Sequence, residues 1–419
     1  MFKKIVVSLI FILAINSFAQ EATSSPYSFY GIGEIKFKGA VENRSMGGLS
    51  VFKDSIHLNL SNPASYSGLK NIVFAVAGNT NETTLSSKVQ EAKTKRTSLD
   101  YLALALPITK NLCVSTGLIS YSSVGFNVTQ NITDPNATTS FKTSTGSGGL
   151  NKVFIGAAYN IFPELSAGLN VDFNFGKIST NNLRILNNIE YGTNEVNNIN
   201  INGVNFTAGL MYESKFKSKL QVSAGLTFTP AHNLTFVTER TFFTVKNPAF
   251  LGTDFLETIA VLVPDVDDKV PAKVSFGLGI GKSKKWEFGS EVVLQGTNNF
   301  GGKFSSIANV KFENTTEIRI GGYFIPKYNS FDNYFKRIVY KAGINYKNLG
   351  MVINGKSNNE QTLTAGLGLP LYGVFSNINI GFEIGKRGTK MGGLIQENFK
   401  TLTIGLSLND LWFKRTRYE

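Results

Sequence analysis

The sequence predicts an all-β protein: a transmembrane antiparallel β-barrel of about fourteen strands, with an N-terminal segment inside its lumen. Three observations lead to this fold class. Segments of roughly ten residues alternate strictly between apolar and polar side chains, and the connections between them alternate between long and short. The chain is only 17% charged, whereas about a quarter of the residues of a soluble protein are usually charged.

The N-terminal residues 1–19 have the features of a secretory signal peptide. Lys3 and Lys4 precede an apolar run over 5–15, and small residues end the segment at Ala19, which favours cleavage there. The run is too short for a membrane anchor. The net charge of +13 accompanies no recognised nucleic-acid motif, so nucleic acid is not an expected partner.

Residues 20–70, called the hatch segment below, alternate poorly and are rich in Gly, Ser and Asn. Apolar residues at Met46, Leu49 and Leu60 argue against disorder. The segment ends with Asn62-Pro63-Ala64, where proline restricts both its own backbone and that of Asn62. We expect this segment to fill the lumen, ahead of a barrel over 71–410.

The barrel strands follow from the two-residue period. In 163–176, for example, Leu169, Val171 and Phe173 alternate with polar or small residues, as in a strand with one face in lipid. The predicted strands are 71–80, 97–107, 111–122, 150–160, 163–176, 203–214, 219–230, 271–282, 285–296, 313–326, 337–348, 359–371, 375–386 and 398–408.

The connections decide between a soluble sandwich and a membrane barrel. Long segments follow the odd-numbered strands, as over 81–96, 123–149 and 177–202, and turns of a few residues follow the even-numbered ones. Outer-membrane barrels have short periplasmic turns and longer outside loops. An even strand count returns the C-terminus to the side of the N-terminus. We therefore expect a Gram-negative outer-membrane location with both termini periplasmic, including a basic tail over 411–419.

The polar face of the strands then lines the lumen, and it carries several charges. Two interpretations stay open: paired charges that hold the wall to the hatch segment, or a path for charged solutes. The charged lumen residues are Asp172, Lys273, Glu287, Glu291, Glu317, Arg319, Lys341 and Glu383.

The sequence offers little for catalysis, so we expect no enzyme. The two histidines, His57 and His232, lack the spacing of a metal site. Asp54, Ser55 and His57 are close in sequence, but a catalytic group needs a matching geometry. The single cysteine excludes an intrachain disulfide. No motif for a cofactor or a metal is present.

The longest connection, 231–270, is unusually apolar for an outer loop. Its residues Phe255, Leu256, Ile259 and Leu262 have helix-like spacing. An exposed apolar loop must cover or bind something, and three roles stay open: a lid packed on neighbouring loops, capture of an apolar ligand, or contact with a partner protein. The residues that we select for capture are Phe242, Phe243, Phe250, Phe255, Leu256 and Ile259.

These features together resemble the FadL family of outer-membrane transporters for long-chain fatty acids and other hydrophobic compounds. Met46-Gly47-Gly48 and Asn62-Pro63-Ala64 are similar to the hatch of that family, and 270–279 is similar to its proline-containing strand before a short hairpin. Ser122-Ser123-Val124-Gly125-Phe126 lies where the family has a Pro-Phe-Gly-Leu-like segment after strand three. This chain lacks the proline and displaces the phenylalanine.

The resemblance implies passive uptake of hydrophobic small molecules, such as long-chain fatty acids, caught by outer loops and released past the hatch. It also implies a sideways exit at a kink in strand three, which we place at Ser123, Gly125 and Phe126. Membrane lipids, lipopolysaccharide and a hydrophobic ligand are then the expected partners. The altered segment favours an alternative: a non-transporting FadL-like barrel that serves as a subunit of an outer-membrane protein secretion or assembly machine and binds other outer-membrane proteins.

Overall fold

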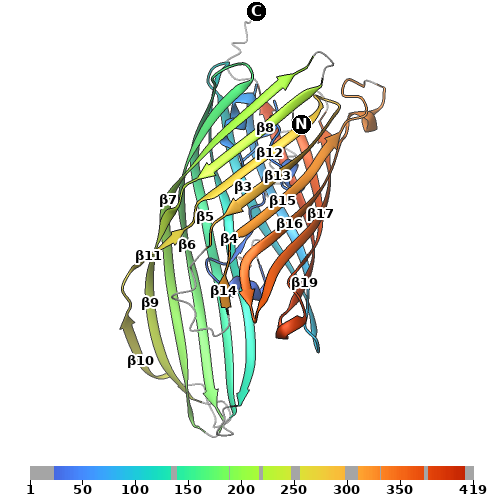
Figure 1. The fold of residues 1–419 in the computed structure, drawn as a ribbon. Coiled ribbons are helices and arrows are strands. Elements are labelled where there is room, and N and C mark those ends of the chain that lie inside the picture. Colours follow the sequence, from blue (N-terminus) through green and yellow to red (C-terminus); the bar gives the residue numbers. More distant parts are fainter. Residues whose placement is uncertain are drawn as a thin grey trace, which may run out of the picture.

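Fourteen long strands form a closed antiparallel barrel (Figure 1). The computed structural model describes residues 23–133, 139–187, 189–216, 220–246, 255–297, 310–330, 332–371 and 376–410. The last strand pairs with the first, from Ile72 opposite Asp410 to Ser86 opposite Gln396, and this pairing closes the cylinder. The barrel strands are β2 (Ile72–Ser86), β3 (Glu91–Pro107), β4 (Leu112–Thr133), β5 (Thr139–Asn160), β6 (Leu165–Leu186), β7 (Tyr191–Lys215), β8 (Gln221–Thr229), β12 (Lys273–Lys282), β13 (Trp286–Gln295), β15 (Thr315–Phe324), β16 (Val339–Ile353), β17 (Lys356–Pro370), β18 (Asn377–Arg387) and β19 (Gln396–Asp410).

The predicted fold class is therefore confirmed, and each predicted strand overlaps one of the fourteen. The alternation has the expected cause. On β12, Phe276 and Leu278 are about half exposed on the outer face, whereas Gly277 and Gly279 face the lumen. Apolar side chains that face lipid and small side chains that face the interior are the pattern of a membrane barrel. Among the described residues, no helix is long and apolar enough to cross a membrane.

Five further strands and five short helical turns complete the described chain. The strands are β1 (Glu34–Ile35), β9 (His232–Lys246), β10 (Phe255–Leu262), β11 (Val266–Val270) and β14 (Val310–Phe312). The helical turns are η1 (Pro26–Phe29), α2 (Val41–Arg44), η2 (Pro63–Gly68), η4 (Tyr334–Arg337) and η5 (Met391–Gly393).

The predicted long connections are mostly continued strands, which corrects the sequence-based expectation. The β4–β5 ladder runs to Thr133↔Thr139 and the β6–β7 ladder to Arg184↔Thr193. Strands of 22 residues extend about 70 Å, against a hydrocarbon layer of about 30 Å. The extensions of β4 to β7, with β9 and β10, form a tall wall on one side of the barrel (Figure 1). We call it the long-hairpin wall, and the opposite end of the barrel the short-turn end.

The apolar connection 231–270 is part of this wall, and the helix-like spacing of its residues was misleading. Phe255–Leu262 forms a strand, β10, that pairs with β9. β-branched residues such as Ile259 and Val261 favour a strand over a helix, and pairing with β9 outweighs the weak 3.6-residue pattern.

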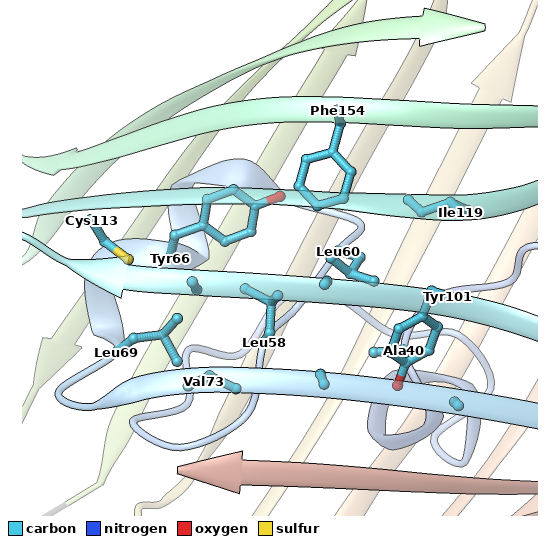
Figure 2. Close-up of a cluster of buried hydrophobic side chains, with 14 of the residues drawn as sticks. Ala40, Leu58, Leu60, Tyr66, Leu69, Val73, Tyr101, Cys113, Ile119 and Phe154 are labelled. Atoms are coloured by element: carbon cyan, nitrogen blue, oxygen red, sulfur yellow. The ribbon is translucent and has the colours of Figure 1, made fainter. Parts of the chain in front are cut away.

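The hatch segment, described from residue 23, lies against the inner face of the barrel. It has little regular structure, yet nearly all of its residues over 40–52 are buried. Leu58, Leu60 and Tyr66 pack on inward-facing residues of β2 to β5, including Tyr101 and Phe154 (Figure 2). Burial of these apolar groups stabilises the segment by about 25 cal/mol per Å² of covered surface.

Candidate functional site: a gap in the barrel wall that the hatch segment fills

The barrel wall is interrupted between β3 and β4. Their ladder ends at Tyr101↔Ile119, although β3 continues to pair with β2 as far as Glu91 and β4 continues to pair with β5. The register of β4 shifts between Ser120 and Ser122, and such bulges bend a strand and end its pairing. Beyond this point no backbone pairing joins the described residues of β3 and β4, so the wall has a gap on the side of the long-hairpin wall.

The N-terminal part of the hatch segment fills this gap. Its strand β1 takes the place of β3 beside β4, with Glu34 opposite Ser123 and Ile35 opposite Ser122. The Ser122 hydroxyl donates to the Ile32 carbonyl at 2.7 Å. These bonds satisfy backbone groups of β4 that would otherwise form an exposed edge.

The predicted gateway residues all lie at this contact, but the bend is not where the sequence placed it. The Gly125 amide donates to Ser28 Oγ at 3.1 Å, and the Phe126 ring meets Phe29 edge-on with centroids 5.0 Å apart. Gly125 itself pairs regularly with β5. The bulge lies earlier, between Ser120 and Ser122, where the sequence carries no glycine or proline to mark it.

Around Phe126 the hatch segment covers an apolar surface of the inner wall. Ile32 is buried in a cluster with side chains from β4, β5, β6, β7, β9 and β11, and Phe29 and Ile35 pack against it. The wall residues of this cluster are Val124, Phe126, Leu150, Ile178, Ile199, Ile201, Leu234, Phe236 and Val270. The apolar side of the lumen is therefore already occupied by side chains of the chain itself.

The Asn62-Pro63-Ala64 motif is a fitted turn against β6 and β7. Asn62 caps η2 by accepting from the Ala64 amide at 3.0 Å, and the Ser166 hydroxyl donates to the Ala64 carbonyl at 3.1 Å. A Cβ atom at Gly168 or Gly209 would overlap this turn. Two wall glycines thus create the space in which the motif sits.

A second seat of this kind holds Met46 and Gly47 against β15 and β16. Side chains at Gly321 or Gly343 would overlap the backbone of these two residues. Gly47 has a φ of +73°, in the left-handed region that glycine adopts readily. Asn345 donates to the Gly47 carbonyl at 3.0 Å. The hatch segment therefore packs closely against two separate parts of the wall, β6 with β7 and β15 with β16.

Buried ion pairs add to this grip, and Arg387 on β18 makes the densest group. Its guanidinium lies 2.8 Å from Glu34 of β1, 2.6 Å from Glu360 and 3.2 Å from Glu397. Lys38 of the hatch segment also pairs with Glu360, at 2.6 Å. All of these side chains except Lys38 are at most 12% exposed.

Two further arginines connect the hatch segment with the wall. Arg44 pairs with Glu383 at 2.5 Å and with Asp100 at 3.2 Å. Arg319 pairs with Glu291 and donates to the Gly48 carbonyl at 3.0 Å. Of the two interpretations of the lumen charges, the arrangement favours pairs that hold wall and hatch together. The sequence carries no signal for these pairs, because their members are far apart in the chain: 28 residues separate Arg319 from Glu291, and 339 separate Arg44 from Glu383.

Two of the lumen cavities lie on opposite sides of the hatch segment. One, of about 190 Å³, faces the long-hairpin wall and has a mixed lining, with charged groups such as Lys152 and Asp172 and apolar side chains such as Ile119 and Phe154. The other, of about 460 Å³, opens at the short-turn end around Asp54, His57 and Glu287. Leu58 and Leu60 lie in the hatch segment between them.

The neighbouring residues Asp54, Ser55 and His57 form a pair rather than a triad. His57 Nδ1 lies 2.7 Å from an Asp54 carboxylate oxygen. Its Nε2 atom has no hydrogen-bond partner among the described residues and lies 3.9 Å from Glu42. A general base needs a nucleophile within hydrogen-bond reach, and this geometry supplies none. The described residues contain no group of three or more side chains suited to a metal ion.

The residues selected for ligand capture are spread along the β9–β10 hairpin. Phe242 and Phe243 are half-buried in β9, and Ile259 of β10 lies opposite Phe242 with 51% of its surface exposed. Phe255 and Leu256 belong to β10. Phe250 lies outside the described residues, as do the predicted signal peptide and the C-terminal tail.

Comparisons with known proteins agree with this architecture. A family model described as BamG matches residues 1–419. The toluene transporter TodX of P. putida is similar in structure, with a TM-score of 0.57, 14% identity, and coverage of 89% of this chain and 98% of that one. A Pseudomonas aeruginosa FadL homologue has a TM-score of 0.57 and 11% identity, covering 90% and 98%. The Ralstonia pickettii toluene transporter TbuX has a TM-score of 0.56 and 12% identity, covering 88% and 98%. No curated protein matches the chain at a significant level.

Proposed function

The chain belongs to the BamG family, and from its geometry we propose that it is a partner-binding barrel subunit of an outer-membrane protein assembly or secretion machine. One observation carries the proposal: the gap in the wall is filled by the chain's own β1 strand, and the apolar surface behind it is covered by Phe29, Ile32 and Ile35. The barrel is then a closed body that offers its outer surfaces to other proteins.

The chemistry of the inner cavity supports this proposal. Apolar side chains line part of this cavity, but an apolar ligand there would also lie against Lys152, Asp172 and Lys273. Removing such groups from water without a polar partner is costly, so the cavity suits water better than a hydrocarbon chain.

The long-hairpin wall offers the surface that we assign to the partner. We place the short-turn end in the periplasm, following the usual arrangement of such barrels, and the wall outside the cell. On β10, the side chains of Ile259, Val261 and Leu262 are 51%, 38% and 96% exposed. Among the described strands β10 pairs with β9 alone, and an apolar strand with one unpaired edge favours protein association.

Site-specific crosslinking tests this assignment. A photoreactive residue at Leu262, introduced into the full chain in living cells, should give a discrete protein adduct. The matched control replaces Phe288, which is 54% exposed on the membrane face of β13, and should give lipid adducts only. If Leu262 gives no protein adduct while the barrel is present at its normal level, the partner-binding proposal is wrong.

A second candidate function is uptake of hydrophobic small molecules, and the interrupted β3–β4 ladder favours it. An exit beside β4 would open if β1 moved away from Ser122 and Ser123. The likeness to hydrocarbon channels supports this candidate through the fold, since those proteins share 11–14% identity with the chain. Long-chain fatty acids are one example of the hydrophobic ligands that the family resemblance implies.

A disulfide lock separates the two candidates. Ile35→Cys and Ser122→Cys place cysteines on paired strands, close enough for a disulfide. The native Cys113 is buried and free. For a channel, oxidation should abolish uptake of labelled toluene and oleate by liposomes, and reduction should restore it. For a partner-binding subunit, uptake should be at background in both states, while the Leu262 adduct is unchanged.

A further inference from the structure

Two neighbouring rows of side chains cross the outer face of seven strands, from β15 through β19 to β3. In the first row the paired residues on β15 to β18 are apolar: Ile320, Ile344, Leu363 and Ile384. The row continues across β19, β2 and β3 with Lys400, Glu82 and Lys95. One end of the row is therefore apolar and the other is charged.

The second row repeats this division one step nearer the strand ends. It begins with Ile318 and Tyr346, which pair across β15 and β16. It then passes through Gln361, Lys386 and Asn398 to Thr84 and Lys93. Ile344, Leu363 and Ile384 are between 46% and 60% exposed, so the rows face away from the lumen.

Both rows line one open groove of about 1080 Å³ on the outer face of the barrel. Over this stretch β3 is not paired with β4, so the β2–β3 hairpin borders the groove with no further strand beyond it. The groove is larger than either lumen cavity. It is also separate from the hatch segment, whose residues do not line it.

The charged half of the groove is basic. Lys93, Lys95, Lys386 and Lys400 line it with one acidic residue, Glu82. Lys95 and Glu82 are 3.3 Å apart and about two-thirds exposed, so this pair is loosely held. The other carboxylates of β17 to β19 point into the lumen, where Glu360, Glu383 and Glu397 are nearly fully buried. The outward field of this region is therefore positive.

We propose that this groove binds a phosphorylated glycolipid of the outer leaflet, of the lipid A type. Acyl chains would lie on Ile320, Ile344, Leu363 and Ile384, and the phosphates would meet the four lysines. The groove adjoins the membrane-facing band of the barrel, where the surrounding medium is lipid, which favours a lipid over a protein. A free phosphate would leave the apolar half unused. The inference rests on the proposed orientation of the barrel, with the long-hairpin wall outside the cell.

Binding of purified bis-phosphorylated lipid A to the full-length protein in detergent tests the proposal, with native mass spectrometry as the readout. The variant replaces Lys93, Lys95, Lys386 and Lys400 by glutamine. Each lysine near an anionic lipid surface contributes about fivefold in affinity, so we expect a loss of about 50-fold or more. Lipid A without phosphates should bind the unaltered protein as weakly as phosphorylated lipid A binds the lysine variant.

A matched control removes four exposed lysines at the short-turn end: Lys282, Lys285, Lys327 and Lys336. Their replacement by glutamine should change the affinity less than about threefold, because these lysines lie away from the groove. Both variants should keep the heat-modifiable mobility of a folded barrel, since all exchanged side chains are exposed.

Three results would overturn the proposal. The first is an affinity for lipid A that does not differ between the groove variant and the unaltered protein, or that falls as much in the control variant as in the groove variant. The second is full competition by millimolar inorganic phosphate, which would indicate an anion site without lipid. The third is a protein adduct and no lipid adduct from a photoreactive residue at Gln361 in cells, which would make the groove a protein contact. The Leu262 adduct reports on the partner-binding proposal independently of these results.

Discussion

Replacement of Arg387 by methionine should release the N-terminal part of the hatch segment from the wall gap. Arg387 is 5% exposed and contacts Glu34, Glu360 and Glu397. Without it, Glu34 keeps Lys36 at 3.5 Å and Glu360 keeps Lys38 at 2.6 Å. Among the described residues Glu397 has no other ionic partner and keeps only the hydrogen bond from the Ser25 hydroxyl, so the substitution leaves one buried carboxylate without a compensating charge.

The magnitude follows from this count. Removing one partner of a buried ion pair costs about 3–5 kcal/mol, and each 1.4 kcal/mol changes an equilibrium constant about tenfold. The equilibrium between the docked and released states of β1 should therefore shift by about a hundredfold to a few thousandfold. The Lys95–Glu82 pair provides the control, because both side chains are mostly exposed and such pairs contribute about 0–1 kcal/mol.

Trypsin cleavage after Lys36 and Lys38 in reconstituted liposomes measures the shift. Both lysines lie in the docked segment, and cleavage tracks the open population when closing is fast relative to cutting. We expect Arg387→Met to accelerate cleavage at least a hundredfold and Lys95→Met by less than about fivefold. Adding Glu397→Gln to the Arg387 variant should recover part of the protection, because the uncompensated charge is gone. A correctly folded Arg387→Met barrel that is cut at the unaltered rate would refute the reasoning.

Three further predictions follow from other contacts. Gly209→Ala should lower the unfolding temperature by several degrees, because the added Cβ overlaps Asn62. Gly225→Ala should change the unfolding temperature little, since its Cβ would lie 3.5 Å from its nearest neighbours. Equal shifts in the two variants would contradict the close fit of Asn62-Pro63-Ala64 against the wall. Burial opposes the charged form of His57, but its attraction to the half-exposed Asp54 carboxylate raises the pKa of His57 above 6.5 and lowers the pKa of Asp54 from 3.8 to about 2. The pair should therefore protect the hatch segment from proteolysis fully between about pH 4 and 6.5, and less as the pH rises through the raised pKa of His57 or falls from 3.8 towards 2. His57→Gln should remove the loss of protection at alkaline pH, and an unchanged dependence of proteolysis on pH in this variant would count against the pair. The protein should be recovered as a heat-modifiable band in the outer-membrane fraction, and recovery from the soluble periplasm would contradict the barrel assignment.

The membrane-spanning part of the fold could be predicted because lipid imposes a repeating pattern. Strand β6 shows the period plainly, with Leu169, Val171 and Phe173 facing outwards and Asn170 and Asp172 facing the lumen. The extensions of the same strands were missed. In Thr139–Gly146 both faces contain Thr, Ser or Lys, so the alternation between apolar and polar side chains that lipid requires is absent. Strand pairing continues there, but its sequence signal ends with the lipid.

The position of the gap in the wall could be predicted approximately, and the contacts that fill it could not. Gly125 and Phe126 were selected next to the observed bulge, and both touch the hatch segment. The partner of Arg44, Glu383, lies 339 residues away, and one sequence contains no information that joins two such positions. Glycines such as Gly168 were read as a small inner face, but only the structure shows which segment needs the space.

The two seats of the hatch segment have a consequence for how the barrel is assembled. The segment precedes every barrel strand in the chain, yet it touches β6 and β7 at Asn62-Pro63-Ala64 and β15 and β16 at Met46 and Gly47. It therefore bridges the two halves of the folded cylinder, and we expect these contacts to form before the seam between β2 and β19 closes. Such a bridge shortens the effective loop that seam closure must order, and so lowers its entropic cost. We therefore expect the hatch segment to hold the two halves of the sheet together while the barrel closes. The barrel of a chain without this segment should close more slowly and expose its unpaired strand edges for longer.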